Sequence, residues 1–328
     1  MSLKALLEVL ADGEFHSGEE LGACLGVSRT AVWKQLKKLK ELGLDHYSVK
    51  GRGYRIPGGL DLLDEEKLSS YLQAEVAANL QAVDLQLSIE STNLMAMQGL
   101  QEGKGKGYLY LAEHQTAGKG RRGRGWVSPF SRNLYFSLTW TFSQGAAALE
   151  GLSLVVGLAI ARGLADAGVA GVGLKWPNDL LYEGKKLAGI LLEMTGDASG
   201  FCQVVIGVGV NVSMPDADGR LIDQPWTDLD RCLEGSVAPR MGRNQLLAAI
   251  LNRLVPVMEM FSEQGFSPFR QQWMELDAFA NQTVALQTHS LEIQGVARGV
   301  DGAGALLLET EEGIRAFHGG ELSLRAVG

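Results

Sequence analysis

Apolar side chains recur every three or four positions from Leu3 to Leu42, the period that predicts amphipathic helices. Ser17, followed three residues later by Glu20, predicts that the second helix starts with a capping box. Ser28 predicts the start of a third helix, and the glycine at position 43 predicts its end. We therefore expect three helices in the first 43 residues.

Two short extended pieces follow, Asp45–Val49 and Gly53–Ile56, joined by the basic tip Lys50-Gly51-Arg52. This order of elements resembles a winged helix-turn-helix domain, in which one helix enters the major groove and the wing contacts phosphates or the minor groove. A small helical domain that makes only protein contacts is the alternative. The candidate DNA contacts are Ser28, Arg29, Thr30, Lys34, Lys50 and Arg52.

Helical and alternating patterns follow one another after the linker Pro57-Gly58-Gly59. Residues 213–241 are rich in Pro, Asp and Gly, which predicts a long loop containing Trp226. The predicted helices cover 64–73, a segment up to 100, 146–167, 244–264 and 268–276, and the predicted strands cover 83–89, 107–113, 133–140, 186–192 and 201–212.

From Ala280 onward the chain alternates in short runs separated by glycine turns, which predicts a small β-barrel of about five strands. Together the patterns indicate an α+β protein. We expect three domains, covering residues 1–60, 61–276 and 277–328.

The composition is that of a globular protein: 46% of the 328 residues are hydrophobic and 21% are charged. No apolar run is long enough to span a bilayer, and the first residues lack a signal-peptide layout. The three scattered cysteines favour reduced thiols in a cytoplasm over disulfides or a zinc site. The net charge of −8 conceals a basic stretch, since residues 28–55 hold eight basic and two acidic side chains.

A basic, glycine-rich loop begins after Gln115 and leads into the strand that ends at Trp140. Glycines let backbone amides approach a ligand, and cations beside those amides repel each other unless an anion lies among them. The loop does not open a helix, which excludes a dinucleotide fingerprint, and it lacks a Walker A pattern. A solvated surface hairpin is the alternative. The loop contains Gly118, Lys119, Gly120, Arg121, Arg122, Gly123, Arg124 and Gly125.

Polar residues also gather at the ends of other predicted strands. Residues 174–193 predict an antiparallel unit that carries Lys175, Asn178, Asp179 and Lys186. Ser91, Thr92 and Asn93 stand at a strand-to-helix junction, where they either cap the helix or contact a ligand. Asn211 lies at the end of a nearly continuous apolar strand.

Four motifs carry a family resemblance: AGKGRRGRGW, LKWPNDLLYEGKKLAGILLE, VGVNV and the C-terminal GGELSLR. In this order they resemble the biotin–protein ligases, and with the winged helix the chain is similar to bifunctional bacterial biotin operon repressor/biotin ligases. The resemblance covers essentially the full chain. It implies a class II synthetase-like mixed sheet with helices in the centre and an SH3-like C-terminal barrel.

Such enzymes join the biotin carboxylate to the α-phosphate of ATP, forming biotinyl-5′-AMP, and then transfer biotin to a lysine of the biotin carboxyl carrier protein of acetyl-CoA carboxylase. Two anions meet in the first step, so cations must offset their repulsion. The resemblance makes Lys186, Arg121 and Asp179 catalytic, with Asp179 orienting either the acceptor lysine or Mg²⁺. The protein alone provides no metal site.

The resemblance also distributes binding roles over the motifs. At two positions the chain departs from the family: Lys119 replaces the usual arginine and keeps the charge without the bidentate reach, and Gly125 replaces a basic residue. Biotin is expected to contact Ser91, Thr92, Asn93, Gln115, Lys119, Gly120, Arg121, Lys186 and Gly189. ATP or the adenylate is expected to contact Arg121, Arg122, Arg124, Trp126, Asn178, Lys186, Asn211, Trp226 and Arg325.

A regulatory link follows as a hypothesis: biotinyl-AMP orders loops, two chains pair through a central edge, and the homodimer presents two winged helices to operator DNA. In the alternative use of this edge it docks the carrier protein, so that demand for biotin competes with repression. No membrane partner is expected. Three alternatives stay open: a ligase whose N-terminal domain does not repress, a non-catalytic biotin-sensing transcription factor, and a lipoate ligase.

Overall fold

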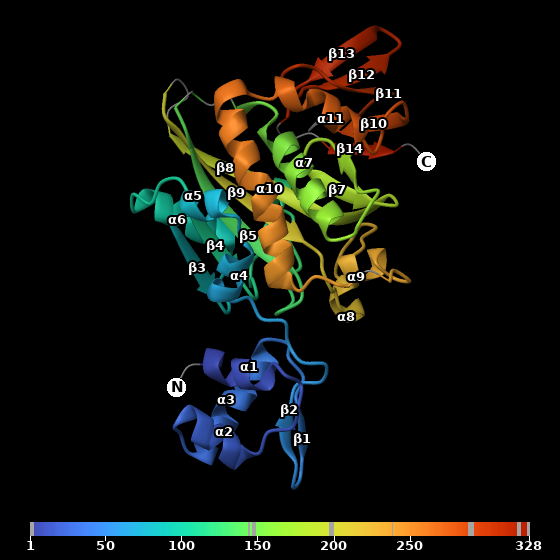
Figure 1. Cartoon of the computed structure of the whole chain (residues 1–328). Helices are drawn as coiled ribbons and strands as arrows, with labels where there is room; N and C mark the ends of the chain where they lie inside the picture. Colours follow the sequence, from blue (N-terminus) through green and yellow to red (C-terminus); the bar gives the residue numbers. More distant parts are fainter. Residues whose placement is uncertain are drawn as a thin grey trace.

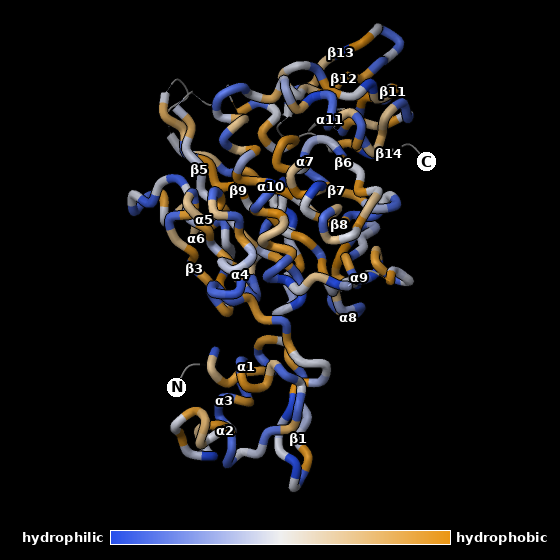
Figure 2. Tube along the Cα trace, viewed as in Figure 1, coloured by the Kyte–Doolittle hydropathy of each residue, from blue (hydrophilic) through white to orange (hydrophobic). Residues whose placement is uncertain are grey.

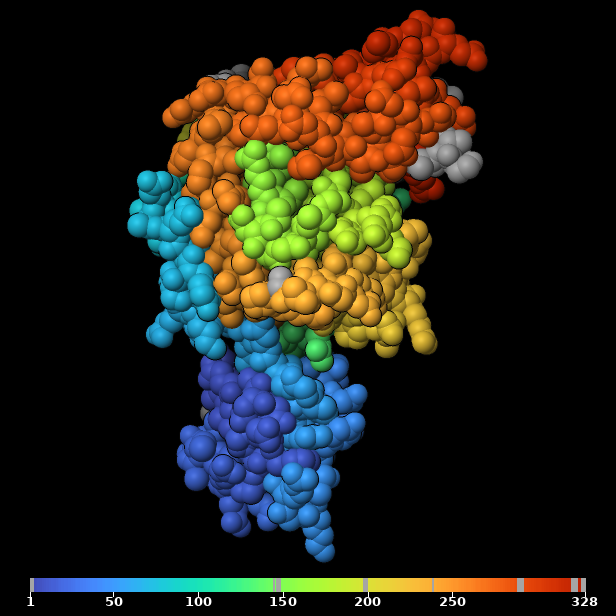
Figure 3. Space-filling model, turned by 45° about the vertical axis from the view of Figure 1, so that its right-hand side comes forward, coloured from blue at the N-terminus to red at the C-terminus, as the bar shows by residue number. Residues whose placement is uncertain are grey.

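The computed structural model describes residues 3–143, 145, 149–196, 200–237, 239–287, 292–319 and 323–326. An N-terminal unit protrudes from a larger body, to whose far end the C-terminal strands are attached (Figure 1; Figure 3). Apolar residues concentrate in the strands and helices inside this body, while polar residues follow its loops (Figure 2). In the part of the chain so described, no helix is long and apolar enough to cross a membrane.

The N-terminal unit is a winged helix-turn-helix, as predicted. Glu20 N donates to Ser17 Oγ at 3.0 Å and Ser17 N donates to Glu20 Oε2 at 3.2 Å, so the predicted capping box is confirmed. Ser28 caps the third helix, whose Val32, Leu36 and Leu39 are buried. The elements of the N-terminal unit are α1 (Leu3–Leu10), α2 (Gly18–Leu25), α3 (Arg29–Glu41), β1 (Tyr47–Val49) and β2 (Gly53–Arg55).

A seven-stranded mixed sheet forms the centre, with strand order β3-β4-β5-β9-β8-β7-β6. Of the strand pairs described in this sheet, β3–β4 is parallel and the others are antiparallel. The strands are β3 (Ala82–Gln86), β4 (Tyr108–Ala112), β5 (Leu134–Phe142), β6 (Gly173–Lys175), β7 (Asp179–Tyr182), β8 (Lys185–Gly196) and β9 (Cys202–Val210).

Helices cover both faces of this sheet because its central strands alternate apolar residues toward each face. On one face, Val204, Ile206 and Val208 of β9 share a core with α7 (Leu152–Asp166) and α10 (Arg243–Gln264). On the other face, Val205 packs with α6 (Thr92–Gln101). Shorter helices complete the body: α4 (Glu65–Tyr71), α5 (Ala74–Asn79), α8 (Asp216–Gly219), α9 (Leu229–Cys232) and α11 (Arg270–Glu275).

Several predicted boundaries were wrong. The strand predicted over 83–89 ends at Gln86. The helix predicted over 64–73 is the shorter α4, and α5, which begins at Ala74, was not predicted. The helix predicted from position 146 begins at Leu152, after Gly151 at φ +78°; residues 146–148 lie outside the described ranges. The predicted loop 213–241 contains two short helices, α8 and α9. The side chain of Asp228 caps α9 by accepting from Arg231 N at 2.9 Å.

The C-terminal unit has the five predicted strands, all antiparallel. Their order is β13-β12-β11-β10-β14. A buried hydrogen bond of 3.1 Å from Trp176 Nε1 to the carbonyl of Gly304 ties this unit to the central sheet. The strands are β10 (Thr283–Gln287), β11 (Glu292–Val300), β12 (Leu306–Thr310), β13 (Gly313–Phe317) and β14 (Ser323–Ala326).

A buried ion pair holds the connection between the N-terminal and central units. Arg243 Nη2, at the start of α10, lies 2.6 Å from Glu113 Oε2, and both side chains are at most 3% exposed. The same guanidinium donates to the Asp61 carbonyl, and Glu113 Oε1 accepts from Leu63 N. Phe130, which follows the basic loop, packs into the N-terminal core. The connecting segment is therefore anchored to the end of β4 and to the loop beyond it.

Candidate functional site

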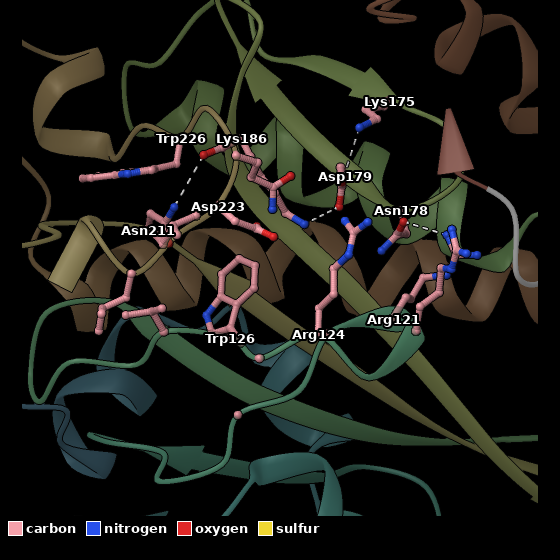
Figure 4. Close-up of a pocket in the computed structure, with 18 of the residues that line it drawn as sticks. Arg121, Arg124, Trp126, Lys175, Asn178, Asp179, Lys186, Asn211, Asp223 and Trp226 are labelled. Atoms are coloured by element: carbon pink, nitrogen blue, oxygen red, sulfur yellow. Dashed lines mark hydrogen bonds and ion pairs between the residues drawn. The ribbon is translucent and has the colours of Figure 1, made fainter. Parts of the chain in front are cut away.

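Two adjoining cavities lie where the basic loop crosses the sheet. The larger, of about 490 Å³, opens between that loop, the β6–β7 hairpin and residues 221–226 (Figure 4). The smaller, of about 40 Å³, continues toward the start of α6, the middle of β8 and the end of β9. Five residues line both cavities: Gly120, Arg121, Trp126, Asn178 and Lys186.

The β6–β7 hairpin places a carboxylate between two lysines. Lys175 ends β6 and Asp179 begins β7, directly opposite each other in register. Asp179 Oδ1 lies 2.7 Å from Lys186 Nζ, and Asp179 Oδ2 lies 3.7 Å from Lys175 Nζ. Burial lowers the pKa of the Lys175 ammonium, the charges of Lys186, Arg325 and Arg124 lower it further, and Asp179 raises it.

The basic loop folds back over this hairpin. Arg121 Nη1 donates to Asn178 Oδ1 at 2.9 Å, and Asn178 Nδ2 donates to the Ile190 carbonyl at 2.8 Å (Figure 4). The loop contains one short 3-10 turn, Arg121–Gly123, in which Arg122 has φ +59°. As predicted, no α-helix begins in this loop. The hydrogen bond to Asn178 connects Arg121 to the β6–β7 hairpin.

A hydrogen-bonded network lines the smaller cavity. Gln115 Oε1 accepts from Thr92 N at 2.8 Å, and Asn93 Nδ2 donates to Glu193 Oε2 at 2.7 Å. Ser91 precedes α6, yet its side chain makes no capping hydrogen bond, so the capping interpretation was wrong for this residue. The structure brings all nine residues expected to contact biotin to this cavity: Ser91, Thr92, Asn93, Gln115, Lys119, Gly120, Arg121, Lys186 and Gly189.

Three strand glycines form the floor of the smaller cavity. Gly189 and Gly209 are opposite each other on β8 and β9, and the indole of Trp126 lies against both. Gly207 is covered by the side chain of Asn93, whose Oδ1 would lie 1.9 Å from an added Cβ. Gly207 and Gly209 were not predicted as site residues. Their signal was visible, because glycine inside a strand marks close approach of a ligand or another group.

The larger cavity is cationic at one end and aromatic at the other (Figure 4). Trp226 lines the aromatic end, where its backbone forms a parallel bridge with Lys186 and its ring stacks 4.1 Å from the Arg231 guanidinium. Asn211 Nδ2 donates to the Thr227 carbonyl at 3.0 Å. Asn211 Oδ1 and Trp126 Nε1 are buried without a hydrogen-bond partner among the described residues, which suits a site built for a polar ligand.

Eight of the nine residues expected to contact the nucleotide line this cavity: Arg121, Arg122, Arg124, Trp126, Asn178, Lys186, Asn211 and Trp226. The ninth, Arg325, does not line it. Arg325 is exposed on β14, and its charge lowers the pKa of Lys175. The neighbouring Leu324 lines the wall of the larger cavity. Side chains in β14 alternate between its two faces, so adjacent residues cannot both line the wall. Lys175, which was predicted to lie on the antiparallel unit but was given no binding role, also lines this cavity, as does Asp223, which was not predicted.

The candidate DNA contacts are exposed on the N-terminal unit. The Arg52 guanidinium stacks 4.3 Å from the Phe15 ring, and the exposed Trp33 on α3 carries Lys37 Nζ 3.6 Å from its ring. Trp33 was not predicted to be a surface residue of the DNA-binding unit, because aromatic residues in amphipathic helices are usually buried. The exposed predicted residues are Ser28, Arg29, Thr30, Lys34, Lys50 and Arg52.

Across the described ranges, no three His, Cys, Asp or Glu side chains gather in a metal-binding cluster. Both carboxylate oxygens of Asp179 face lysines. A magnesium ion prefers six oxygen ligands, several of them water, so this site does not hold one by protein ligands alone.

Comparison with known proteins places these features in context. Over 321 residues the chain is 42% identical to the bifunctional ligase/repressor BirA of Salmonella typhimurium and 41% identical to that of Escherichia coli, covering 98% of this chain and 97% and 96% of theirs. Profiles match for the Biotin/lipoate A/B protein ligase family (residues 86–211), an HTH domain (2–55) and the Biotin protein ligase C terminal domain (279–325).

Solved structures agree with the fold. The biotin protein ligase from Aquifex aeolicus in complex with biotin and ATP is 27% identical, with a TM-score of 0.64, over 76% of this chain and 100% of that chain. A mutant of the same ligase, in complex with biotin, has a TM-score of 0.62 at 27% identity, over 75% of this chain and 99% of that chain.

Proposed function

This chain belongs to the family of bifunctional ligase/repressors, and from that premise we propose that it joins biotin to ATP and transfers the biotinyl group to a carrier lysine. In the first step the biotin carboxylate attacks the α-phosphorus, forming biotinyl-5′-AMP and releasing pyrophosphate. In the second, the carrier amine attacks the acyl carbonyl, releasing AMP. The acceptor is the biotin carboxyl carrier protein of acetyl-CoA carboxylase.

The observation that carries this proposal is the junction of the two cavities. Biotin binds at the smaller cavity, whose amide and hydroxyl groups match its polar ring, and the nucleotide occupies the larger one. At about 40 Å³ the smaller cavity must widen to admit biotin, which requires the basic loop above it to move. Its phosphates lie at the cationic end and its base lies between Trp126 and Trp226. Lys186 and Arg121 line both cavities, so their charges stand where the carboxylate meets the α-phosphate.

Each catalytic residue has a distinct role in this scheme. Lys186 leaves Asp179 to contact the carboxylate and α-phosphate, which reduces the repulsion between the two anions. Arg121 retains the reactive adenylate under the basic loop, which excludes water. Mg²⁺ arrives with ATP as part of the substrate, and Asp179 lies near the phosphates to orient either that ion or the acceptor lysine.

We further propose that the chain represses transcription as a homodimer that forms when biotinyl-AMP is bound. The winged helix presents the basic contacts to operator DNA. Met194 of β8 and Phe201 just before β9 are 58% and 59% exposed, which supports an association edge at this end of the sheet. We place the domains at residues 1–60, 61–276 and 277–328, and the protein in the cytoplasm.

The ligase proposal is tested by incubating the protein with ATP, Mg²⁺, labelled biotin and a biotin carboxyl carrier domain. We expect label on the carrier, loss of label with Lys186→Ala, and free biotinyl-AMP in solution with Arg121→Gly. Lys185→Ala is the matched control, because Lys185 is exposed and lines neither cavity. If the wild-type protein forms neither biotinylated carrier nor adenylate, the chain is a sensor and not an enzyme.

Repression is tested separately, by binding to DNA fragments with and without biotin and ATP. Binding that strengthens with both ligands supports the repressor. Unchanged, weak binding indicates a ligase whose N-terminal unit does not repress.

A further inference from the structure

Lys175 stands across the hairpin from Asp179, at a position that the proposed reaction leaves without a role. The two residues are paired in register at the end of β6 and the start of β7, next to the turn formed by residues 176–178. Asp179 is in turn opposite Gly189 of β8, which brings Lys186 to its other side. The backbone of the hairpin therefore fixes one carboxylate between two ammonium groups.

The two lysines are not equivalent. Lys186 Nζ lies 2.7 Å from one carboxylate oxygen of Asp179, and Lys175 Nζ lies 3.7 Å from the other. Lys186 lines both cavities, whereas Lys175 lines only the larger one. The side chains of Asp179, Lys186 and Lys175 are 13%, 16% and 18% exposed. Lys186 can reach a ligand in either cavity, whereas Lys175 faces the larger cavity only.

A mostly buried carboxylate that loses its partner is strongly disfavoured. If Lys186 turns to the biotin carboxylate and the α-phosphate, Asp179 loses its nearer cation during the reaction in which Asp179 itself takes part. We infer that Lys175 is the positioning residue for Asp179, providing a countercharge that holds its carboxylate in place while Lys186 contacts the ligand. This inference rests on the proposed ligase function.

The electrostatics around Lys175 agree with this role. Burial and the cations Lys186, Arg124 and Arg325 all lower the pKa of Lys175, and Asp179 is the group whose charge raises it. Asp179 is therefore the group that favours the charged form of Lys175, against burial and the neighbouring cations. A lysine that instead bound phosphate directly would need no carboxylate beside it. Positioning of Asp179 therefore predicts that substitutions at Lys175 and Asp179 have coupled effects on the rate, and direct phosphate binding predicts independent effects.

The test is a double-mutant cycle on the two half-reactions of the full-length protein. Adenylate formation is measured as pyrophosphate release without carrier, and transfer is measured in a single turnover from biotinyl-AMP to the carrier domain. We expect Lys175→Met to slow the same half-reaction as Asp179→Asn, by about tenfold to a hundredfold. The double variant should be no slower than Asp179→Asn alone.

Further variants separate this role from general damage. Lys175→Arg should recover most of the lost rate, because the charge beside Asp179 returns, and Lys185→Met should stay within about twofold of wild type. Multiplicative losses in the double variant, or a loss in the half-reaction that Asp179→Asn spares, would overturn the inference. So would a raised KM for ATP with an unchanged kcat, which indicates a direct phosphate contact. If the wild-type protein forms no biotinyl-AMP, the proposed function itself fails, which is a distinguishable result.

Discussion

The indole of Trp126 lies across Gly209, so closely that a Cβ on Gly209 would come within 2.4 Å of Trp126 Cε2. Trp126 comes from the basic loop and Gly209 from the middle of the sheet. The missing side chain at position 209 is what allows the loop to close over the smaller cavity. The ring and the glycine together control the room available to a ligand.

Gly209→Ala should therefore weaken biotin binding by about tenfold or more, since the added methyl displaces the indole into the cavity. Isothermal titration calorimetry with biotin alone measures this without interference from catalysis. Gly105→Ala is the control, because a Cβ there meets no atom within 4 Å. Wild-type affinity in Gly209→Ala would show that Trp126 does not shape the cavity.

The buried pair Glu113–Arg243 should matter for stability. Glu113→Gln leaves a buried guanidinium without its countercharge, and we expect the free energy of unfolding to fall by about 3–5 kcal/mol. Urea denaturation followed by circular dichroism measures the change. The control is Asp166→Asn, which breaks the exposed pair with Arg253 and should cost about 0–1 kcal/mol. Equal losses in the two variants would contradict the prediction.

Lys34 and Lys50 should contribute to DNA binding through phosphate charge. Each substitution to alanine should weaken binding similarly on all sequences and reduce the salt dependence of log K by about 1. Fluorescence anisotropy at several salt concentrations measures both, with a fragment that the ligand-loaded protein selects from a random pool. Lys104→Ala, in the central unit, should leave the slope unchanged. An unchanged slope in Lys50→Ala would remove the wing tip from the interface.

Cys232 lies on α9 near Thr227, and burial raises the pKa of its thiol to about 11. Because only the thiolate reacts, alkylation of Cys232 by iodoacetamide should be slow at pH 8 and rise about tenfold per pH unit up to pH 10. Mass spectrometry of labelled peptides follows each cysteine. The exposed Cys24 should label first, and rapid labelling of Cys232 at pH 8 would show that its segment opens readily.

The sequence by itself determined the features that depend on neighbouring residues. Ser17 and Glu20 are three positions apart, so their capping box forms within one helix turn, and the five C-terminal strands follow from alternation between glycine turns. The motifs also indicated which residues gather around the two cavities. The family was recognisable because these motifs keep their order along the chain.

Only the tertiary structure decided how distant segments meet. Four features depend on residues far apart in the chain. They are the strand order, the end of β3 at Gln86, the contact of Trp126 with Gly209 and the burial of Glu113 against Arg243. Local patterns carry no information about such partners, because the free energy of each contact depends on what packs opposite it. Arg325 is the clearest case: its motif placed it near the nucleotide, but the alternation of side chains in β14 turns Leu324 to the cavity instead.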